Sequence, residues 1–168
     1  MFWLFIKVFL LSVVVVVKSD DDGLKVCLKK LGCLEGIEMA GINDDNFEAF
    51  LGVPFAKPPV GDLRFRNPEP VESWEGVLSA RAAKSDCKQR NYLMPNWPIM
   101  GDEDCLYMNI YRPKGVIDKS LPVIFYIYGG GLFSGSSNPA ILGPEYFINT
   151  QEVIVVITTY RLGPFGKL

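Results

Sequence analysis

Hydrophobic residues form two uninterrupted runs in the second half of the chain, at residues 123–128 (VIFYIY) and 153–157 (VIVVI). Both runs are short, uncharged and rich in β-branched or aromatic residues, which predicts strands buried on both faces, although a buried helical segment has the same pattern. Such strands are usually covered by helices of about a dozen residues. The sequence contains no amphipathic segment of that length, so it supplies strands without their covering helices.

Shorter apolar stretches predict more strands in the first third of the chain. Residues 24–36 form two stretches about a turn near 29–32, which is typical of a hairpin. Residues 47–55 (FEAFLGVPF) predict a further strand. Single helical turns are predicted at 80–84 and at 144–149.

A proline-rich segment connects the early strands to the middle of the chain. Residues 54–70 hold five prolines in 17 residues, which excludes a helix or a central strand. Four apolar side chains in this segment favour an ordered, irregular connection over a flexible linker, because linkers are usually polar. Trp74 follows and is predicted to anchor the packing.

The amino terminus has the pattern of a secretory signal peptide. A single charge at Lys7 precedes a largely apolar run at 8–17, which is shorter than the roughly 20 residues needed to cross a bilayer. Small residues near Ser19 suit a cleavage site, so residues 1–19 are predicted to be removed, leaving a domain at 24–168. The alternative is an uncleaved amino-terminal anchor.

Charge and cysteine content restrict the kind of partner that the chain can bind and the cell compartment in which it folds. Removing the two lysines of the signal peptide leaves 15 basic against 19 acidic residues, and no basic patch indicates a nucleic acid partner. Four cysteines in a chain that enters an oxidising compartment predict two disulfides. A hairpin brings Cys27 and Cys33 within bridging distance. A redox or metal role for this pair is disfavoured, because the chain has neither C-x-x-C spacing nor histidine.

Three consecutive glycines, 129–131, follow the apolar run at 123–128. A dinucleotide-binding G-x-G-x-x-G is excluded, because its last position falls on Ser134. Glycines after an early strand also build the oxyanion hole of α/β-hydrolases, where peptide N–H groups stabilise a tetrahedral intermediate. The alternative is a turn that is merely flexible.

Five sequence blocks decide between these alternatives. The blocks are 50–61 (FLGVPFAKPPVG), 63–65 (LRF), 74–77 (WEGV), 103–111 (EDCLYMNIY) and 128–135 (YGGGLFSG). In this order they resemble the type-B carboxylesterase/cholinesterase family, including insect esterases of the juvenile hormone esterase type. The resemblance covers about residues 24–166. It implies the amino-terminal portion of an α/β-hydrolase fold, with a small antiparallel hairpin and the first strands of the central mixed sheet.

The resemblance implies that Gly130 and Gly131 are the oxyanion-hole glycines. Tyr128 stands where many members have histidine and cholinesterases have tyrosine. Thr159 stands where the family usually has asparagine.

Three further roles follow from the resemblance. It implies a Cys87–Cys105 disulfide, which closes a loop at the rim of the active-site gorge, and a structural ion pair between Arg64 and Glu103. Trp97 lies near the position of a choline-binding tryptophan in cholinesterases. The alternative for Trp97 is an ordinary loop residue.

The catalytic residues of a serine esterase are missing from the sequence. The chain has no histidine and no G-x-S-x-G, since its nearest approximation, at 135–139, ends in proline. We therefore expect a secreted serine esterase that acts on a small carboxylic ester in full-length form, with no cofactor, no metal and no stable membrane anchor. The 168-residue chain itself is expected to be truncated before the nucleophile and inactive. The alternatives are a non-catalytic, cholinesterase-like adhesion or binding protein and an inactive truncated product.

Overall fold

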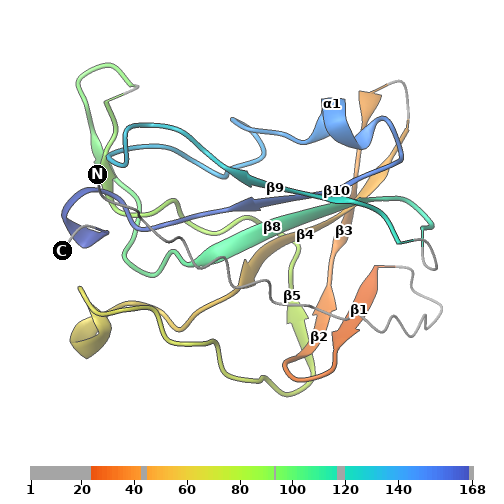
Figure 1. Cartoon of the computed structure of the whole chain (residues 1–168), viewed down its shortest axis with the longest axis horizontal. Helices are drawn as coiled ribbons and strands as arrows, with labels where there is room; N and C mark the ends of the chain where they lie inside the picture. Colours follow the sequence, from red (N-terminus) through yellow and green to blue (C-terminus); the bar gives the residue numbers. More distant parts are fainter. Residues whose placement is uncertain (1–23, 43–44, 93, 117–119, 167–168) are drawn as a thin grey trace, which may run out of the picture.

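The computed structural model describes residues 24–42, 45–92, 94–116 and 120–166 of the chain. The predicted signal peptide, residues 1–19, lies outside the described residues. Within the described ranges the chain forms three sheets and very little helix (Figure 1). No helix in this part of the chain is long and apolar enough to cross a membrane.

Five strands build a mixed central sheet. In sheet order they are β3 (Ile37–Met39), β4 (Phe47–Pro54), β8 (Tyr107–Pro113), β10 (Ile154–Thr158) and β9 (Val123–Ile127). Neighbouring strands are antiparallel except β9 and β10, which are parallel. Parallel neighbours need a crossover connection. Residues 128–153 make it here, and they include the three glycines and the four-residue helix α1 (Glu145–Ile148).

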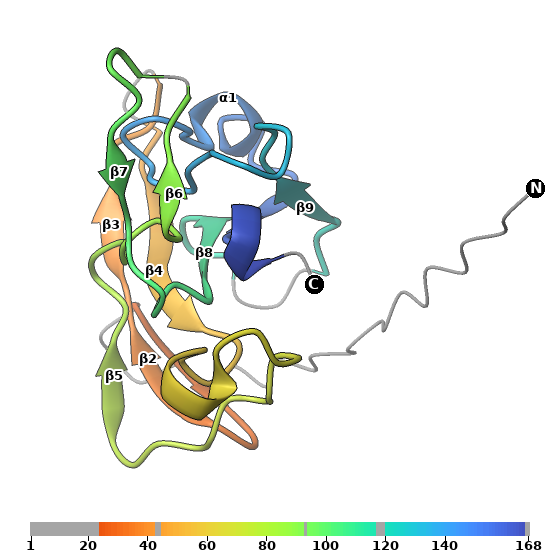
Figure 2. The same ribbon diagram turned by 90° about the vertical axis from the view of Figure 1, so that its left-hand side faces the viewer.

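A smaller sheet packs below the central one in Figures 1 and 2. It contains β1 (Lys25–Leu28), β2 (Gly32–Glu35) and β5 (Val77–Ser79), with β1 and β2 antiparallel and β5 parallel to β2. A separate two-stranded ribbon, β6 (Gln89–Arg90) and β7 (Ile99–Met100), lies within the loop between Cys87 and Cys105. Two short 3-10 helices cover Gly61–Leu63 and Gly163–Phe165.

Strand β4 separates two hydrophobic clusters, because successive side chains of a strand point to opposite faces. Its odd-numbered residues Phe47, Ala49 and Leu51 pack with Tyr111 and Ile148, which brings α1 against one face. The other cluster contains Phe50 and Val53 of β4 together with Val26, Leu34 and Ala80, which holds the small sheet against the opposite face. These two clusters lie on opposite faces of β4, and a third cluster gathers around the Cys87–Cys105 disulfide, Tyr128 and Leu162.

A bulge adjusts the pairing between β4 and β8. The register shifts between Phe50 and Val53, and Gly52 within the bulge has φ +68°. Its N–H donates to Asn109 Oδ1 at 2.9 Å, which satisfies a donor that the ladder has lost. Asn109 Nδ2 then donates to the Ser137 carbonyl at 2.7 Å, so one buried amide joins β4, β8 and the crossover connection.

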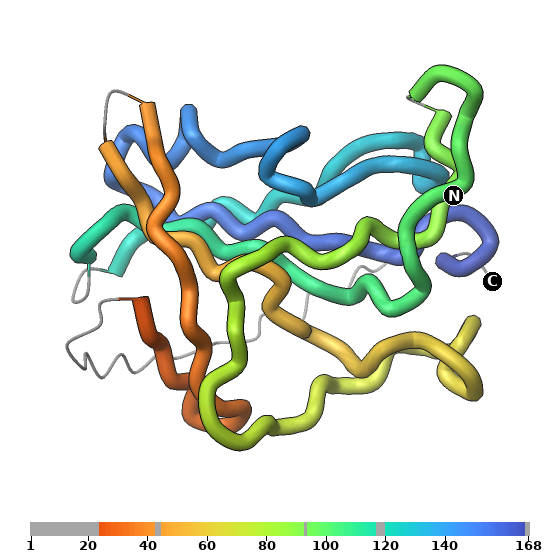
Figure 3. The backbone as a smooth tube through the Cα atoms, turned by 180° about the vertical axis from the view of Figure 1, so that it is seen from behind, coloured from red at the N-terminus to blue at the C-terminus, as the bar shows by residue number. Residues whose placement is uncertain are grey.

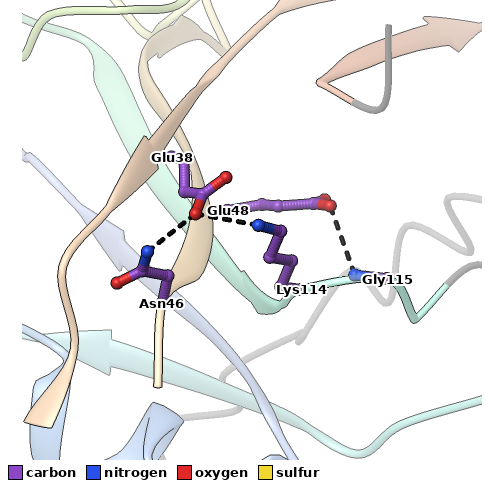
Figure 4. A network of polar contacts seen from close by, with 5 residues as sticks. All are labelled: Glu38, Asn46, Glu48, Lys114 and Gly115. Atoms are coloured by element: carbon purple, nitrogen blue, oxygen red, sulfur yellow. Dashed lines mark hydrogen bonds and ion pairs between the residues drawn. The ribbon is translucent and has the colours of Figure 1, made fainter. Parts of the chain in front are cut away.

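Opposed charges connect the antiparallel strands at the other end of the sheet. Glu48 and Arg112 are direct cross-strand partners and form an ion pair whose side chains are only 7% and 12% exposed. Lys114 Nζ lies 2.9 Å from Glu38 Oε1, and the Asn46 amide donates to the same carboxylate at 2.8 Å (Figure 4). The hydrogen bonds from Lys114 and Asn46 hold the pKa of Glu38 below its ordinary value.

Several sequence predictions are confirmed. The hairpin at 24–36, the strand at 47–55, the strand at 153–157 and the helical turn at 144–149 are all present as β1–β2, β4, β10 and α1. Trp74 is a packing anchor. Its ring packs against the small-sheet cluster, and Nε1 donates to the Cys33 carbonyl at 2.8 Å.

Two predictions are wrong. Residues 80–84 form no helical turn, because this segment bonds to strands instead: the Ala80 carbonyl accepts from the Leu51 N–H at 2.7 Å. The run at 123–128 is a strand, but it is not buried on both faces. Val123, Phe125 and Ile127 are 57%, 55% and 62% exposed, since β9 is the last strand of the sheet and no described helix covers it.

Candidate active site

The glycine loop, residues 129–135, begins where β9 ends, and its conformation requires glycine at one position in particular. The Gly130 carbonyl accepts hydrogen bonds from the N–H groups of Phe133 and Ser134, at 3.1 and 3.2 Å, which closes a tight turn. Gly130 has φ +135°, and a Cβ at this position would lie 1.8 Å from the Ser134 carbonyl oxygen. Any side chain at 130 would therefore force the turn open.

Four peptide N–H groups of this loop, those of Gly129, Gly130, Gly131 and Leu132, have no partner among the described residues. Gly131 has φ +63°, and a Cβ there would meet only the Phe133 ring, at 3.9 Å. Consecutive free N–H groups in such a turn form an anion-binding concavity, which is the arrangement that an oxyanion hole uses.

Neighbouring segments fix the base of the glycine loop. Tyr160 Oη donates to the Tyr128 carbonyl at 2.7 Å, and the two rings stack with centroids 4.6 Å apart. The Gly163 N–H donates to the Leu132 carbonyl at 2.7 Å. Burial raises the pKa of Tyr128 above its ordinary value, so its phenol is neutral at physiological pH. The loop is therefore held by uncharged contacts from the segment that follows β10.

A disulfide-closed loop lies beside the glycine loop at the same end of the central sheet, as Figures 1 and 3 show. Cys87 and Cys105 are joined at its base. Phe133 of the glycine loop packs edge-on against Tyr92, with centroids 6.3 Å apart, and Tyr92 packs against Trp97 at 5.4 Å. Trp97 is 55% exposed, so this aromatic cluster of Tyr92, Trp97 and Phe133 forms an open rim next to the free N–H groups.

The carboxylates that precede Cys105 have separate structural partners. Arg64 Nε lies 2.5 Å from Glu103 Oε2, and the pair ties the proline-rich segment to the disulfide loop. Tyr107 Oη donates to Asp104 Oδ1 at 2.8 Å. Burial, reinforced by this carboxylate, raises the pKa of Tyr107 to about 12. Glu103 and Asp104 thus have different neighbours and do not form an acid/base pair.

Sequence reasoning missed three buried polar residues that organise this site. Gln89 and Asn109 each bond to the segment that follows the glycines, and Thr159 joins β10 to residues Cys105 and Tyr107. Thr159 Oγ1 also accepts from the Tyr107 N–H at 3.0 Å, so threonine is fully bonded where the family usually has asparagine. Their signal in the sequence is weak, because an isolated polar residue is usually solvated and its buried partners are distant in sequence.

The cysteines of the hairpin have a structural setting. Cys27 and Cys33 are opposite each other in the β1–β2 ladder and are joined by a disulfide. The described residues contain no group of three or more potential metal ligands.

A family model described as "Carboxylesterase family" matches residues 23–168. The chain belongs to the carboxylesterase family. Members of this family have an α/β-hydrolase fold, and the mixed sheets with little helix are consistent with its amino-terminal portion.

Three relatives show the breadth of the similarity to other carboxylesterases. The chain is 43% identical to juvenile hormone esterase of Tribolium castaneum, over 83% of this chain and 24% of the relative. It is 38% identical to acetylcholinesterase of Bungarus fasciatus, over 99% of this chain and 28% of the relative. It is 40% identical to para-nitrobenzyl esterase of Bacillus subtilis (strain 168), over 78% of this chain and 27% of the relative. The chain therefore spans about a quarter of the length of these relatives.

Proposed function

We propose that the full-length form of this carboxylesterase hydrolyses small carboxylic esters through a serine acyl-enzyme, with Gly130 and Gly131 as oxyanion-hole donors. The observation that supports the proposal is that the N–H groups of these two glycines, like those of Gly129 and Leu132 beside them, have no partner among the described residues. The sequence resemblance selects Gly130 and Gly131 from these four. Names of relatives at 38–43% identity support ester hydrolysis as the reaction class.

In the proposed reaction, a serine hydroxyl attacks the ester carbonyl while a histidine takes its proton. The carbonyl oxygen becomes an oxyanion, and the two glycine N–H groups donate to it. The tetrahedral intermediate then expels the alcohol, which takes the proton from the histidine, and water releases the acid from the acyl-enzyme in a second cycle. Preorganised donors act mainly on the transition state, and loss of one typically costs about 3 kcal/mol in the barrier.

The 168-residue chain contributes only part of this machinery. It contains no histidine and no G-x-S-x-G sequence, so it has neither the general base nor the nucleophile that the reaction needs. We expect the chain by itself to be inactive. A non-catalytic binding protein is the competing function, and an assay of the longer protein separates the two.

We also propose that the chain is secreted after loss of residues 1–19, leaving the domain at 24–168. Two disulfides support an oxidising compartment. Amino-terminal sequencing of secreted material is expected to begin at Asp20. A start upstream of Val17, or retention in membranes, would contradict this assignment.

The activity test compares the 168-residue chain with a full-length transcript product. The short chain is expected to show no turnover of aryl or alkyl esters above a control protein and no labelling by an organophosphate. The longer protein is expected to hydrolyse these esters and to be labelled by the organophosphate, provided that it contains the serine elbow and a histidine. A longer protein that contains both and still neither hydrolyses esters nor reacts with organophosphate would favour the binding function. Stoichiometric labelling of the short chain would overturn the proposed division of roles.

A further inference from the structure

One buried side chain connects the disulfide loop directly to the glycine loop. Gln89, in β6, is 5% exposed, and its amide makes three hydrogen bonds. Its Nε2 donates to the carbonyls of Gly135 at 2.8 Å and Cys87 at 3.1 Å, while its Oε1 accepts from the Gly135 N–H at 2.9 Å. Both backbone groups of Gly135 are therefore bonded to a single side chain.

The bonded glycine is the last residue of the loop that carries the free donors. Gly135 follows Ser134, whose N–H closes the turn on the Gly130 carbonyl. Gly135 has φ +145°, and a Cβ there would lie 2.2 Å from the Tyr128 ring, so this backbone is pressed against the residue that precedes the glycines. Because the turn between Gly130 and Gly135 is short and closely packed, a displacement of Gly135 should also displace residues 130 and 131.

We infer that Gln89 is a positioning residue, whose amide fixes the direction of the Gly130 and Gly131 N–H groups by holding Gly135 against the disulfide at Cys87. The inference rests on the proposed function, because it assigns those two N–H groups to the oxyanion. Gln89 itself touches no reacting atom. It acts through the glycine loop, and the Cys87–Cys105 bond supplies the fixed point.

Neighbouring contacts extend this attachment without replacing it. Ser136 Oγ donates to Asp86 Oδ1 at 2.8 Å, and Asn109 Nδ2 donates to the Ser137 carbonyl. These contacts hold the two residues after Gly135 and lie farther from the glycines. Of the side chains with described hydrogen bonds, only Gln89 bonds to the backbone of residues 129–135. Loss of the Gln89 amide should therefore move the glycine N–H groups, while the loop stays bonded at Leu132 through the Gly163 N–H and the rest of the connection keeps its contacts.

Substitution by glutamate gives a direct test in the 168-residue chain. In Gln89→Glu, the protonated side chain can donate through its hydroxyl to the Gly135 carbonyl and accept from the Gly135 N–H, which keeps both bonds to Gly135. It loses the bond to the Cys87 carbonyl, because a carboxylic acid has only one donor hydrogen. An ionised carboxylate can only accept, so it loses the bond to the Gly135 carbonyl. The glutamate at this buried position is expected to titrate above the ordinary carboxyl value of about 4.3.

The measurement is the ¹⁵N–¹H spectrum of glycine-labelled chain for wild type, Gln89→Glu and Gln89→Met across pH 4 to 8. In Gln89→Glu, resonances of Gly129, Gly130, Gly131 and Gly135 are expected to lie near wild type at low pH and to move away as pH rises. Wild type recorded over the same pH range is the control for pH effects that do not come from residue 89. Gln89→Met is expected to show the displaced positions at every pH.

A matched control removes the same chemical group elsewhere. Gln151 Nε2 donates to the Ile148 carbonyl beside α1, so Gln151→Met deletes a glutamine hydrogen bond away from the glycine loop. This variant is expected to leave resonances 129–131 unchanged. Unmoved glycine resonances in both Gln89 variants would overturn the inference. So would equal shifts at remote glycines such as Gly61 and Gly76, or a Gln89→Glu spectrum without pH dependence. If Gln89→Met fails to fold, the decision rests on whether the glycine resonances of Gln89→Glu move as pH rises.

Kinetics in an active full-length protein separate this inference from the proposed function. Gln89→Met is expected to lower kcat by up to about 10²-fold, the loss that roughly 1 Å of misplacement causes, with KM nearly unchanged. Displaced glycine resonances in the Gln89 variants, together with no esterase activity in the longer protein, would contradict the proposed function but not the positioning role. An active esterase in which Gln89→Met leaves kcat unchanged would sink the positioning role alone.

Discussion

At the scale of single residues, Gly130 and Gly131 have different reasons to be glycine. A side chain at 130 collides with backbone, whereas a Cβ at 131 makes only an ordinary contact with the Phe133 ring and has the cost of a left-handed conformation. Proline at 131 would be a poor probe of the donor, because its fixed negative φ also rebuilds the turn. Alanine keeps the N–H donor, so it measures the cost of a side chain at each position without removing the donor.

We predict that Gly131→Ala lowers the free energy of unfolding by about 1–2 kcal/mol, the usual cost of a left-handed alanine. Gly130→Ala should cost more, because its Cβ at 1.8 Å from the Ser134 oxygen adds a steric clash to the backbone strain. Urea unfolding of both variants, with Gly61→Ala at another positive-φ glycine in open space as the control, measures the difference. Equal losses at 130 and 131 would contradict the described turn.

Tyr107 makes stability depend on alkaline pH. Its pKa of about 12 in the fold lies above the ordinary value of 10.0, so the folded chain holds a proton that the unfolded chain releases first. Its stabilising contribution is complete below pH 10 and is lost as pH rises from 10 towards 12. We predict that Tyr107→Phe flattens this fall in the free energy of unfolding, while Tyr146→Phe, at an exposed position, leaves it unchanged. An identical slope in wild type and Tyr107→Phe would reject the assignment.

Prediction from sequence worked best where one physical signal dominates a residue. The three glycines, the proline-rich segment and Trp74 were recognised because backbone freedom, missing N–H groups and large apolar area have strong local consequences. Gln89 and Asn109 were missed, because a buried amide differs from a solvated one only through partners that are distant in sequence. Gln89 bonds to Gly135, which lies 46 positions away.

At the scale of elements, β8 could not be predicted for the same reason, because its polar residues depend on partners that are distant in sequence. Its sequence, YMNIYRP, mixes polar and apolar residues and was not predicted as a strand, yet it lies at the centre of the sheet. Asn109 fills the bulge of β4, and Arg112 meets Glu48. Asn109 and Arg112 are acceptable in this central strand because each has a partner on a neighbouring element, whereas the Tyr111 hydroxyl is buried with no described hydrogen-bond partner.

The buried ion pair between β4 and β8 gives a prediction at this scale. Arg112→Met leaves the Glu48 carboxylate buried without its counter-charge, which should cost roughly 3–5 kcal/mol of folding free energy. Lys114→Met removes the exposed partner of Glu38 and should cost no more than about 1 kcal/mol. Thermal unfolding of the two variants compares the buried Glu48–Arg112 pair with the more exposed Glu38–Lys114 pair. A loss in Arg112→Met as small as that in Lys114→Met would refute the buried pair.

At the scale of the whole molecule, the two disulfides close loops of unequal length. Cys87 and Cys105 are 18 positions apart and Cys27 and Cys33 are 6 apart. In the chain-entropy model these loops correspond to about 3 and about 2 kcal/mol of stabilisation. We predict that the double variant Cys87→Ser/Cys105→Ser loses more stability in urea than Cys27→Ser/Cys33→Ser. The reverse order would show that loop entropy does not govern these bonds.

The exposed side of β9 has a consequence for how the chain behaves in concentrated solution. This strand ends the sheet, with Val123, Phe125 and Ile127 more than half exposed in the described structure. An open, uncharged edge of this kind is a template on which a free strand from another molecule can add, which is the usual start of aggregation in β-proteins. The strand that leads into the glycine loop is thus also the site at which unintended sheet growth between molecules is easiest to begin.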